Sequence, residues 1–127
     1  MQKAKMFFYD SYAVLAYLSD NPKYGPYFEE HDGFLTKLNL IEVCYRTLEV
    51  HGTRAASQVL KAFAKYVVDF GLSDIEGAMK LRLKLRKSGC DISYADALGY
   101  YLALKLKVKF LTGDKSFKEL VGVEFVV

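Results

Sequence analysis

Short apolar segments separated by helical patterns are the feature that most restricts the fold of this chain. Residues 5–9 (KMFFY) and 108–112 (VKFLT) are almost continuously apolar, which is typical of strands covered on both faces. Two further short runs, 67–70 (VVDF) and 123–127 (VEFVV), have the same character. Because such strands alternate with helices, we predict an α/β fold, a three-layer α/β/α sandwich with a mostly parallel central sheet. The length predicts one domain over residues 1–127.

Helical patterns cover most of the remaining chain. They span residues 11–18, 34–52, 53–66, 73–89 and 91–107, with a helical turn at 115–120. Thr36 is a plausible N-cap and Gly52 a stop for the second helix. Ser73 and Glu76 have the spacing of a capping box. The segment 23–33 is turn-rich, and we expect it to be irregular.

The segment 80–87 (KLRLKLRK) is ambiguous by pattern alone. Its strict alternation fits a half-buried strand as well as a helix, although capping and length favour a helix. The segment also holds many of the cations of a mildly basic chain with a net charge of +3. That charge is compatible with a polyanionic partner and does not require one.

Two carboxylates follow apolar runs at corresponding places. Asp10 ends the first run, and Asp114 follows the run 108–112 after Thr112 and Gly113. Binding sites of open parallel sheets form beyond the carboxyl ends of the strands, so neighbouring strands would bring both acids to one edge. The alternative interpretation is that each aspartate only caps the helix behind it, which this residue type does well.

Two further acids lie within helical patterns. Asp96 has Ile92, Gly99, Tyr100 and Ala103 as same-face neighbours, so its face is expected to be buried, and a buried carboxylate needs a partner. A salt bridge to a buried cation would satisfy this need, but the sequence indicates no lysine or arginine for that role. Glu42 lies between Leu38 and Tyr45 on the apolar side of its helix, or else it is an ordinary surface glutamate.

Together these four acids indicate a metal site. Four carboxylates at one place would repel one another unless they were neutralised, and hard divalent cations take oxygen ligands. Mg²⁺ prefers a few carboxylates with waters and substrate phosphates, and two ions about 4 Å apart form the arrangement used for phosphodiester cleavage.

Other chemistries and compartments are poorly supported. Cys44 and Cys90 match no zinc or redox spacing and are expected to be free thiols in a reducing compartment. His31 and His51 are isolated, and neither a GxSxG elbow nor a Walker loop occurs. We expect no signal peptide and no membrane span, and therefore a soluble, cytoplasmic protein.

The motifs that carry these acids resemble those of PIN domains. The segments are MFFYDSYAVLAYL, LTKLNLIEVCYRTL, SYADALGYYLALKLKVKFLTGDKSF and VEFVV, and ADALGYYLA followed by FLTGDKSF is the most specific part. The chain is most similar to the small VapC-type toxins of toxin–antitoxin pairs. The resemblance is weakest from residue 53 to residue 89.

The resemblance implies roles for individual residues. The four family acids match Asp10, Glu42, Asp96 and Asp114, with the three aspartates as direct ligands and Glu42 as a ligand or acting through water. Ser11 and Thr112 match accessory hydroxyl positions. Tyr12 stands where many members carry a small polar residue, and Gly113 where arginine or asparagine is frequent.

The resemblance also implies an activity and partners. It implies a Mg²⁺- or Mn²⁺-dependent ribonuclease acting on single-stranded or loop RNA, a homodimer, and an antitoxin whose tail blocks the acidic groove. It favours a helix for 80–87, near the groove, where the cations could contact phosphates or lie on a solvated face: Lys80, Arg82, Lys84, Arg86 and Lys87. Leu83, on the same segment, would fit a dimer or antitoxin surface.

Three rival functions remain open at this stage. The first is an RNA-processing nuclease without an antitoxin. The second is a non-catalytic PIN fold that binds RNA or protein, which the presence of all four acids disfavours. The third is a receiver-like signalling domain with one Mg²⁺, which the spread of the acids over the chain disfavours.

Overall fold

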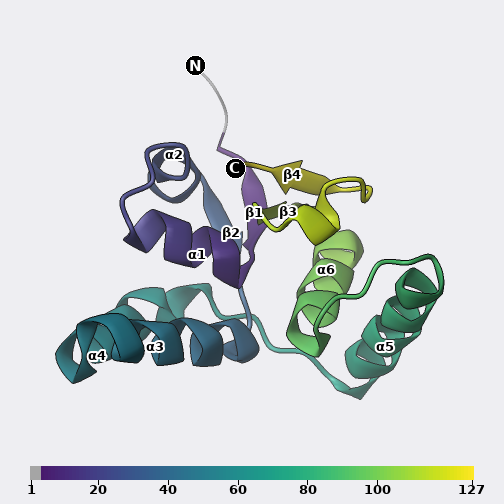
Figure 1. The fold of residues 1–127 in the computed structure, drawn as a ribbon, viewed down its shortest axis with the longest axis horizontal. Coiled ribbons are helices and arrows are strands. Elements are labelled where there is room, and N and C mark those ends of the chain that lie inside the picture. Colours follow the sequence, from purple (N-terminus) through teal and green to yellow (C-terminus); the bar gives the residue numbers. More distant parts are fainter. Residues whose placement is uncertain (1–3) are drawn as a thin grey trace.

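A four-stranded parallel sheet forms the centre of the molecule (Figure 1). The computed structural model describes residues 4–127. The strand order is β2 (Asp32–Phe34), β1 (Met6–Tyr9), β3 (Lys109–Thr112) and β4 (Val123–Phe125), and every neighbouring pair is parallel. The carboxyl ends of all four strands therefore lie at one edge, called here the carboxyl edge.

Helices cover both faces of this sheet. They are α1 (Ser11–Leu18), α2 (Gly25–Glu29), α3 (Lys37–His51), α4 (Thr53–Phe63), α5 (Leu72–Lys87) and α6 (Tyr94–Leu106), with single 3₁₀ turns at Ala64–Tyr66 and Lys115–Phe117. In Figure 1, α1 and α2 lie on one side of the strands and α6 on the other, with α5 beyond α6. Helix α3 packs against α1 and α4. The predicted α/β/α arrangement is confirmed.

The apolar strands explain why both faces are covered. Successive side chains of a strand point to opposite faces. Phe7, Tyr9 and Leu111 therefore belong to a core with α1, α2 and α4, while Phe8 and Phe110 belong to a second core with α5 and α6. A strand buried on both faces has no polar side, which is why its sequence does not alternate.

Gly99 allows α6 to lie close to the sheet. A Cβ atom at this position would be 2.6 Å from Cε1 of Phe8, whose ring is fully buried. The predicted buried face of α6 is confirmed, because Ile92, Tyr100 and Ala103 are all buried. This close packing brings the first turn of α6, which carries Asp96, to the carboxyl edge.

Several local predictions are confirmed. Residues 80–87 are helical, because they continue α5 without a break. The Thr36 side chain accepts the Asn39 N–H and caps α3, and Gly52, with φ 90°, ends it. Cys44 and Cys90 are free thiols. Between residues 4 and 127, none of the helices has both the length and the apolar character required to cross a bilayer.

Other local predictions are wrong. The segment 67–70 is not a strand, since it makes only one isolated bridge, between Val67 and Leu35. The cap of α5 forms two residues earlier than expected: Gly71 and Asp74 take the places predicted for Ser73 and Glu76, and Asp74 accepts the N–H of Gly71. The segment 23–33 is not wholly irregular, because it contains α2 and the start of β2.

Candidate metal and nuclease site

Asp10 is the most constrained acid at the carboxyl edge. It caps α1 directly after β1 and is only 3% exposed. The Thr112 hydroxyl donates to Oδ2 at 2.7 Å, and the Ser11 N–H donates to Oδ1 at 2.8 Å. The Asp10 carboxylate caps α1 and at the same time lies at the candidate site, so the two interpretations of this residue do not exclude each other.

Asp96 faces Asp10 across the edge. Burial, and next the negative charge of Asp96, raise the pKa of Asp10 well above its usual range, against the hydrogen bonds from Thr112 and Ser11. Burial also raises the pKa of Asp96, aided by the charge of Asp114. The two carboxyl groups are close enough to influence each other's pKa. Two acids in such proximity resist simultaneous ionisation.

Asp114 completes a group of three aspartates. Its N–H donates to the Thr112 hydroxyl at 3.0 Å, and its Oδ1 accepts the Ser116 N–H at 2.9 Å. Thr112 is fully buried, and its hydroxyl thus links the main chain of Asp114 to the side chain of Asp10. The predicted accessory position of Thr112 is at the middle of the site.

Glu42 lies at the rim of the site. Glu42 is exposed as a whole residue. Its Oε1 nevertheless accepts a hydrogen bond from the Ser11 hydroxyl at 3.3 Å. Partial burial, and next the charge of Asp96, raise the pKa of Glu42. This shift is consistent with a carboxylate that is close to the other acids and still accessible.

Asn39 is a site residue that sequence reasoning missed. It is 1% exposed, and its Nδ2 donates to the Ser11 hydroxyl at 3.0 Å. Its Oδ1 accepts from the Thr36 N–H at 2.9 Å and from the Thr36 hydroxyl at 3.0 Å. Since Oδ1 takes two donors, the amide orientation is fixed, and the Ser11 hydroxyl must point its proton toward Glu42. The Thr-x-x-Asn spacing at the start of α3 was the available signal.

The acids have no cation to neutralise them within the described chain. No Lys, Arg or His of residues 4–127 forms a salt bridge with Asp10, Glu42, Asp96 or Asp114. Among the described residues, no group of three or more His, Cys, Asp or Glu side chains is arranged so that it could hold a metal ion by itself. Mg²⁺ commonly uses only one or two carboxylates with waters and substrate phosphates. The pair formed by buried Asp10 and half-buried Asp96 therefore fits such an ion.

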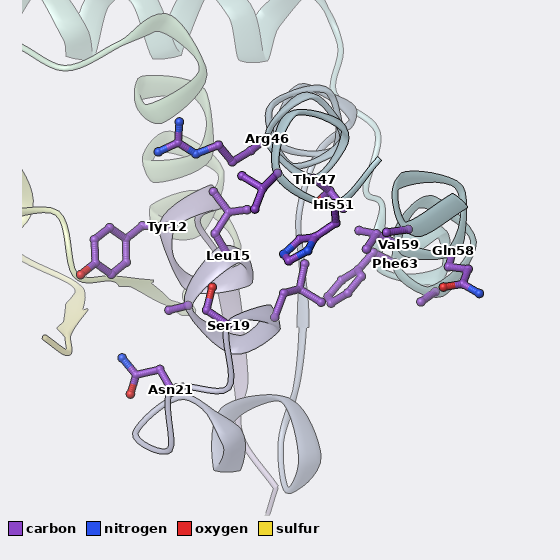
Figure 2. Close-up of a pocket in the computed structure, with 15 residues that line it drawn as sticks. Tyr12, Leu15, Ser19, Asn21, Arg46, Thr47, His51, Gln58, Val59 and Phe63 are labelled. Carbon is purple, nitrogen blue, oxygen red and sulfur yellow. The ribbon is translucent and has the colours of Figure 1, made fainter. Parts of the chain in front are cut away.

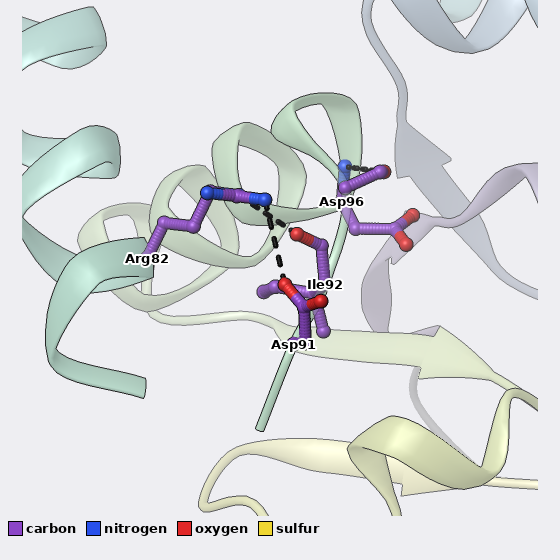
Figure 3. Close-up of polar contacts among 5 residues, drawn as sticks. Arg82, Asp91, Ile92 and Asp96 are labelled. Atoms are coloured by element: carbon purple, nitrogen blue, oxygen red, sulfur yellow. Dashed lines mark hydrogen bonds and ion pairs between the residues drawn. The ribbon is translucent and has the colours of Figure 1, made fainter. Parts of the chain in front are cut away.

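The basic residues of α5 differ in their availability. The Arg82 side chain is 21% exposed; it donates from Nε to the Ile92 carbonyl at 2.8 Å and lies over the Tyr94 ring. Figure 3 shows this guanidinium also directed at Asp91, with the Asp96 carboxylate pointing away from it. Arg82 therefore joins α5 to the start of α6 rather than presenting its charge to a ligand.

The other four cations of this segment are exposed. Lys80 forms a surface ion pair with Glu76 at 3.1 Å, while Lys84, Arg86 and Lys87 are exposed at the end of α5. Asp74 at the start of α5 bonds Lys105 at the end of α6, so the two helices are antiparallel. The end of α5 therefore lies at the same end of this helix pair as Asp96.

An apolar groove adjoins the site. It has a volume of about 740 Å³ and lies between α1, α3 and α4. Figure 2 shows His51, Val59 and Phe63 toward one end and Tyr12 at the other, with Arg46 above it on α3. The Tyr12 end is the one nearer the carboxyl edge, since Tyr12 lies two residues after Asp10.

Comparison with solved structures shows a shared fold. A toxin–antitoxin complex from Klebsiella pneumoniae matches with a TM-score of 0.73 and 16% identity over 95% of this chain and 96% of that chain. VapBC2 from Rickettsia felis, bound to a DNA fragment from its promoter, matches with a TM-score of 0.74 and 17% identity over 95% and 97%. DNA-bound VapBC from Salmonella typhimurium matches with a TM-score of 0.72 and 12% identity over 98% of each chain.

Comparison of sequences gives a family assignment. No curated protein matches this chain. The family model described as the PIN domain matches residues 7–123, which include all four acids. The match covers β2, β3 and all of β1 except Met6, and it ends at the first residue of β4. The resemblance noted in the sequence is thereby confirmed, and the chain belongs to the PIN-domain family.

Proposed function

We propose that this protein is a metal-dependent endoribonuclease and the toxin of a toxin–antitoxin pair. The observation that carries the proposal is the pair of buried Asp10 and half-buried Asp96 at the carboxyl edge, without a neutralising cation in the described chain. Such an arrangement costs free energy, and carboxylates with perturbed pKa values of this kind cluster at functional sites. Membership of the PIN-domain family supports a nuclease.

The proposed ligand set is Asp10, Asp96 and Asp114, with Mg²⁺ or Mn²⁺ as the ion. When bound, the ion supplies an activated water and charge stabilisation for phosphodiester hydrolysis. Thr112 and the Ser11 N–H would orient the two oxygens of Asp10. Glu42, held by the Ser11 hydroxyl at the accessible rim, would bind the ion directly or orient a water.

RNA is the proposed substrate. The acids are at an edge rather than in a closed cavity, which suits a polymer. Lys84, Arg86 and Lys87 would contact phosphates with a salt-dependent contribution to affinity. Lys80 is available at the expense of a weak surface ion pair. For Arg82 we propose a different role, the positioning of α6, because its donors are already used within the chain.

An antitoxin is the proposed protein partner. The three structural neighbours are toxin–antitoxin complexes, and the apolar groove between α1, α3 and α4 is a surface on which a partner segment would bury apolar area. A homodimer is also proposed. Ile41, Tyr45 and Leu48 are exposed at helical spacing on α3 and form an apolar stripe that a second copy would cover. The cytoplasm is the proposed location.

A cleavage assay tests the enzymatic proposal. Purified protein without partner is incubated with labelled single-stranded RNA in Mn²⁺, Mg²⁺ or EDTA. We expect cleavage that requires metal and is lost in Asp10→Asn and Asp96→Asn. Asp20→Asn, at an exposed aspartate beyond the end of α1 that is farther from Asp10, should retain it. Absence of both cleavage and calorimetric metal binding in folded wild type would overturn the proposal in favour of a non-catalytic binding module.

A growth assay tests the toxin proposal. Induced expression of the wild-type chain should arrest growth, and expression of Asp96→Asn should not. Co-expression of the gene neighbouring this one should relieve the arrest and yield a complex on purification. Active ribonuclease without growth arrest would instead indicate an RNA-processing enzyme.

A further inference from the structure

Tyr12 and Gly113 are in direct contact beside the acids. An ideal Cβ at residue 113 would be 2.3 Å from Cε1 of Tyr12 and 2.6 Å from its Cζ, so the ring occupies the space that a side chain at 113 would need. Gly113 is buried. Tyr12 and Gly113, the two positions at which the sequence departs from the PIN pattern, are therefore in contact, and the Tyr12 ring packs on the backbone of Gly113.

The ring is held without being buried. Tyr12 keeps 40% of its surface exposed, although its chain neighbours Ser11 and Ala13 are buried. Beneath it is Gly113, and the Tyr24 ring lies 6.2 Å away at an angle of 45°. The Tyr24 hydroxyl in turn donates to the Val126 carbonyl. Tyr12 thus presents an exposed aromatic surface whose underside is fixed by packing.

The ring is adjacent to the proposed chemistry. Gly113 stands between Thr112, which bonds Asp10, and Asp114. Tyr12 therefore lies two residues after Asp10 along the chain, and it contacts Gly113, the residue before Asp114. Figure 2 shows the ring at one end of the groove, directed toward the C-terminal segment, with the Arg46 side chain nearby.

The surroundings suit a nucleotide. The Arg46 side chain is exposed and makes only a weak surface pair with Glu49, so its charge remains available for a phosphate. The Tyr12 hydroxyl donates no hydrogen bond to any residue between 4 and 127, so no internal bond restrains the outer end of the ring. Sequence-specific recognition of single-stranded RNA commonly stacks an unpaired base on an aromatic side chain.

We propose that Tyr12 determines substrate specificity by stacking on one unpaired nucleobase of the RNA, next to the phosphate that is cut. Gly113 is required because it leaves room for the ring. This inference rests on the proposed ribonuclease function and deepens it. It assigns Tyr12 to substrate binding and gives it no part in the chemical step.

Kinetics separate this role from a structural one. Tyr12→Leu keeps apolar packing on Gly113 and removes the aromatic face. We expect KM for single-stranded RNA to rise about tenfold with kcat nearly unchanged, as for loss of one stacked base. Tyr12→Phe and Tyr12→Trp should restore KM, because both retain an aromatic face.

Modified RNA locates the stacked base. Each nucleotide around the mapped cleavage site is replaced in turn by an abasic ribose, and binding is measured in the Asp96→Asn background to prevent cleavage. At one position the abasic change should weaken binding about tenfold with Tyr12 and have almost no effect with Tyr12→Leu. Equal effects in both proteins at every position would overturn the proposal.

Fluorescence gives a direct readout, because the chain contains no tryptophan. Tyr12→Trp introduces a single reporter, and stacking of a base should quench it on addition of RNA. The control is Val121→Trp, at an 81% exposed position that precedes β4 and so lies toward the opposite edge of the sheet. Quenching at both positions, or at neither, would contradict the assignment.

Failure of this proposal is distinguishable from failure of the proposed function. If wild type neither cleaves nor binds RNA with metal present, the ribonuclease itself is rejected. If wild type cleaves RNA while Tyr12→Leu has an unchanged KM and Tyr12→Trp is not quenched, only the stacking role is rejected.

Discussion

The hydroxyl of Thr112 donates a 2.7 Å hydrogen bond to Oδ2 of Asp10, a residue 102 positions earlier in the chain. The same hydroxyl oxygen accepts the Asp114 N–H at 3.0 Å. The buried Thr112 side chain therefore bonds both Asp10 and Asp114, which follow the neighbouring strands β1 and β3. This arrangement makes Thr112 the first residue to change if the site geometry is to be tested.

Thr112→Val should weaken metal binding without unfolding the protein. Valine has nearly the shape of threonine but leaves Asp10 without its donor and the Asp114 N–H without its acceptor. Partners of metal ligands are typically worth about tenfold or more in affinity, and one lost buried hydrogen bond costs about 1–2 kcal/mol of stability. Calorimetric titration with Mn²⁺ and urea unfolding measure the two effects. Thr112→Ser, which keeps the hydroxyl, should bind metal nearly as wild type does.

Asp96→Asn should abolish cleavage and yet stabilise the metal-free protein. The folded pKa values of Asp10 and Asp96 are raised, so each acid favours folding in its protonated form, and this contribution is lost as the pH rises through the folded values. At neutral pH the amide removes the repulsion. We expect a gain of about 1 kcal/mol, or about 3 °C in Tm. A variant clearly less stable than wild type would show that the repulsion is already relieved.

Asn39→Asp should impair catalysis through Ser11 and Glu42. A carboxylate at this position still accepts from Thr36 but offers no donor to the Ser11 hydroxyl, whose proton would turn toward it and away from Glu42. Single-turnover cleavage should slow about tenfold, as in Ser11→Ala. The double variant should be little worse than either single one, because all three act on one chain of hydrogen bonds. Additive losses would mean that Asn39 acts independently of Ser11.

Asp74 gives a pH-dependent contribution to stability at the far end of α6. Hydrogen bonds from Lys105 and then from the Gly71 N–H hold the pKa of Asp74 below its usual range. A lowered folded pKa stabilises the protein above the unfolded value of about 3.9, and the effect is lost as the pH falls through the folded value. Tm should therefore differ between wild type and Lys105→Met at neutral pH and converge in acid. Lys118→Met, at an exposed position, should show no such convergence.

The sequence predicted the parts of the fold that depend on strong local patterns. The two central strands are continuous apolar runs because both of their faces are buried, and each ends at an acid for the same topological reason. The helix α6 was recognisable from its buried face, including Gly99. Local sequence patterns are therefore sufficient to predict that the three aspartates lie at one edge.

The remaining parts depend on contacts between distant residues. Strand β2 has only three residues, with sequence DGF, and forms because β1 offers an open edge and Gly33 leaves room for the Tyr9 ring. Arg82 is indistinguishable from its basic neighbours by sequence, and only the loop before α6 engages it. Likewise, nothing local to residue 12 or residue 113 shows that the two touch.

The parallel pairing of β1 with β3 has a consequence for the order of synthesis. Strand β1 is translated about 100 residues before its partner β3, which begins at Lys109 and ends at Thr112, with Asp114 two residues later. Contacts between such distant segments form late and slowly. A nascent chain therefore carries separated carboxylates rather than an assembled site until nearly all of these residues have been translated. The proposed site therefore cannot assemble before translation has passed Asp114.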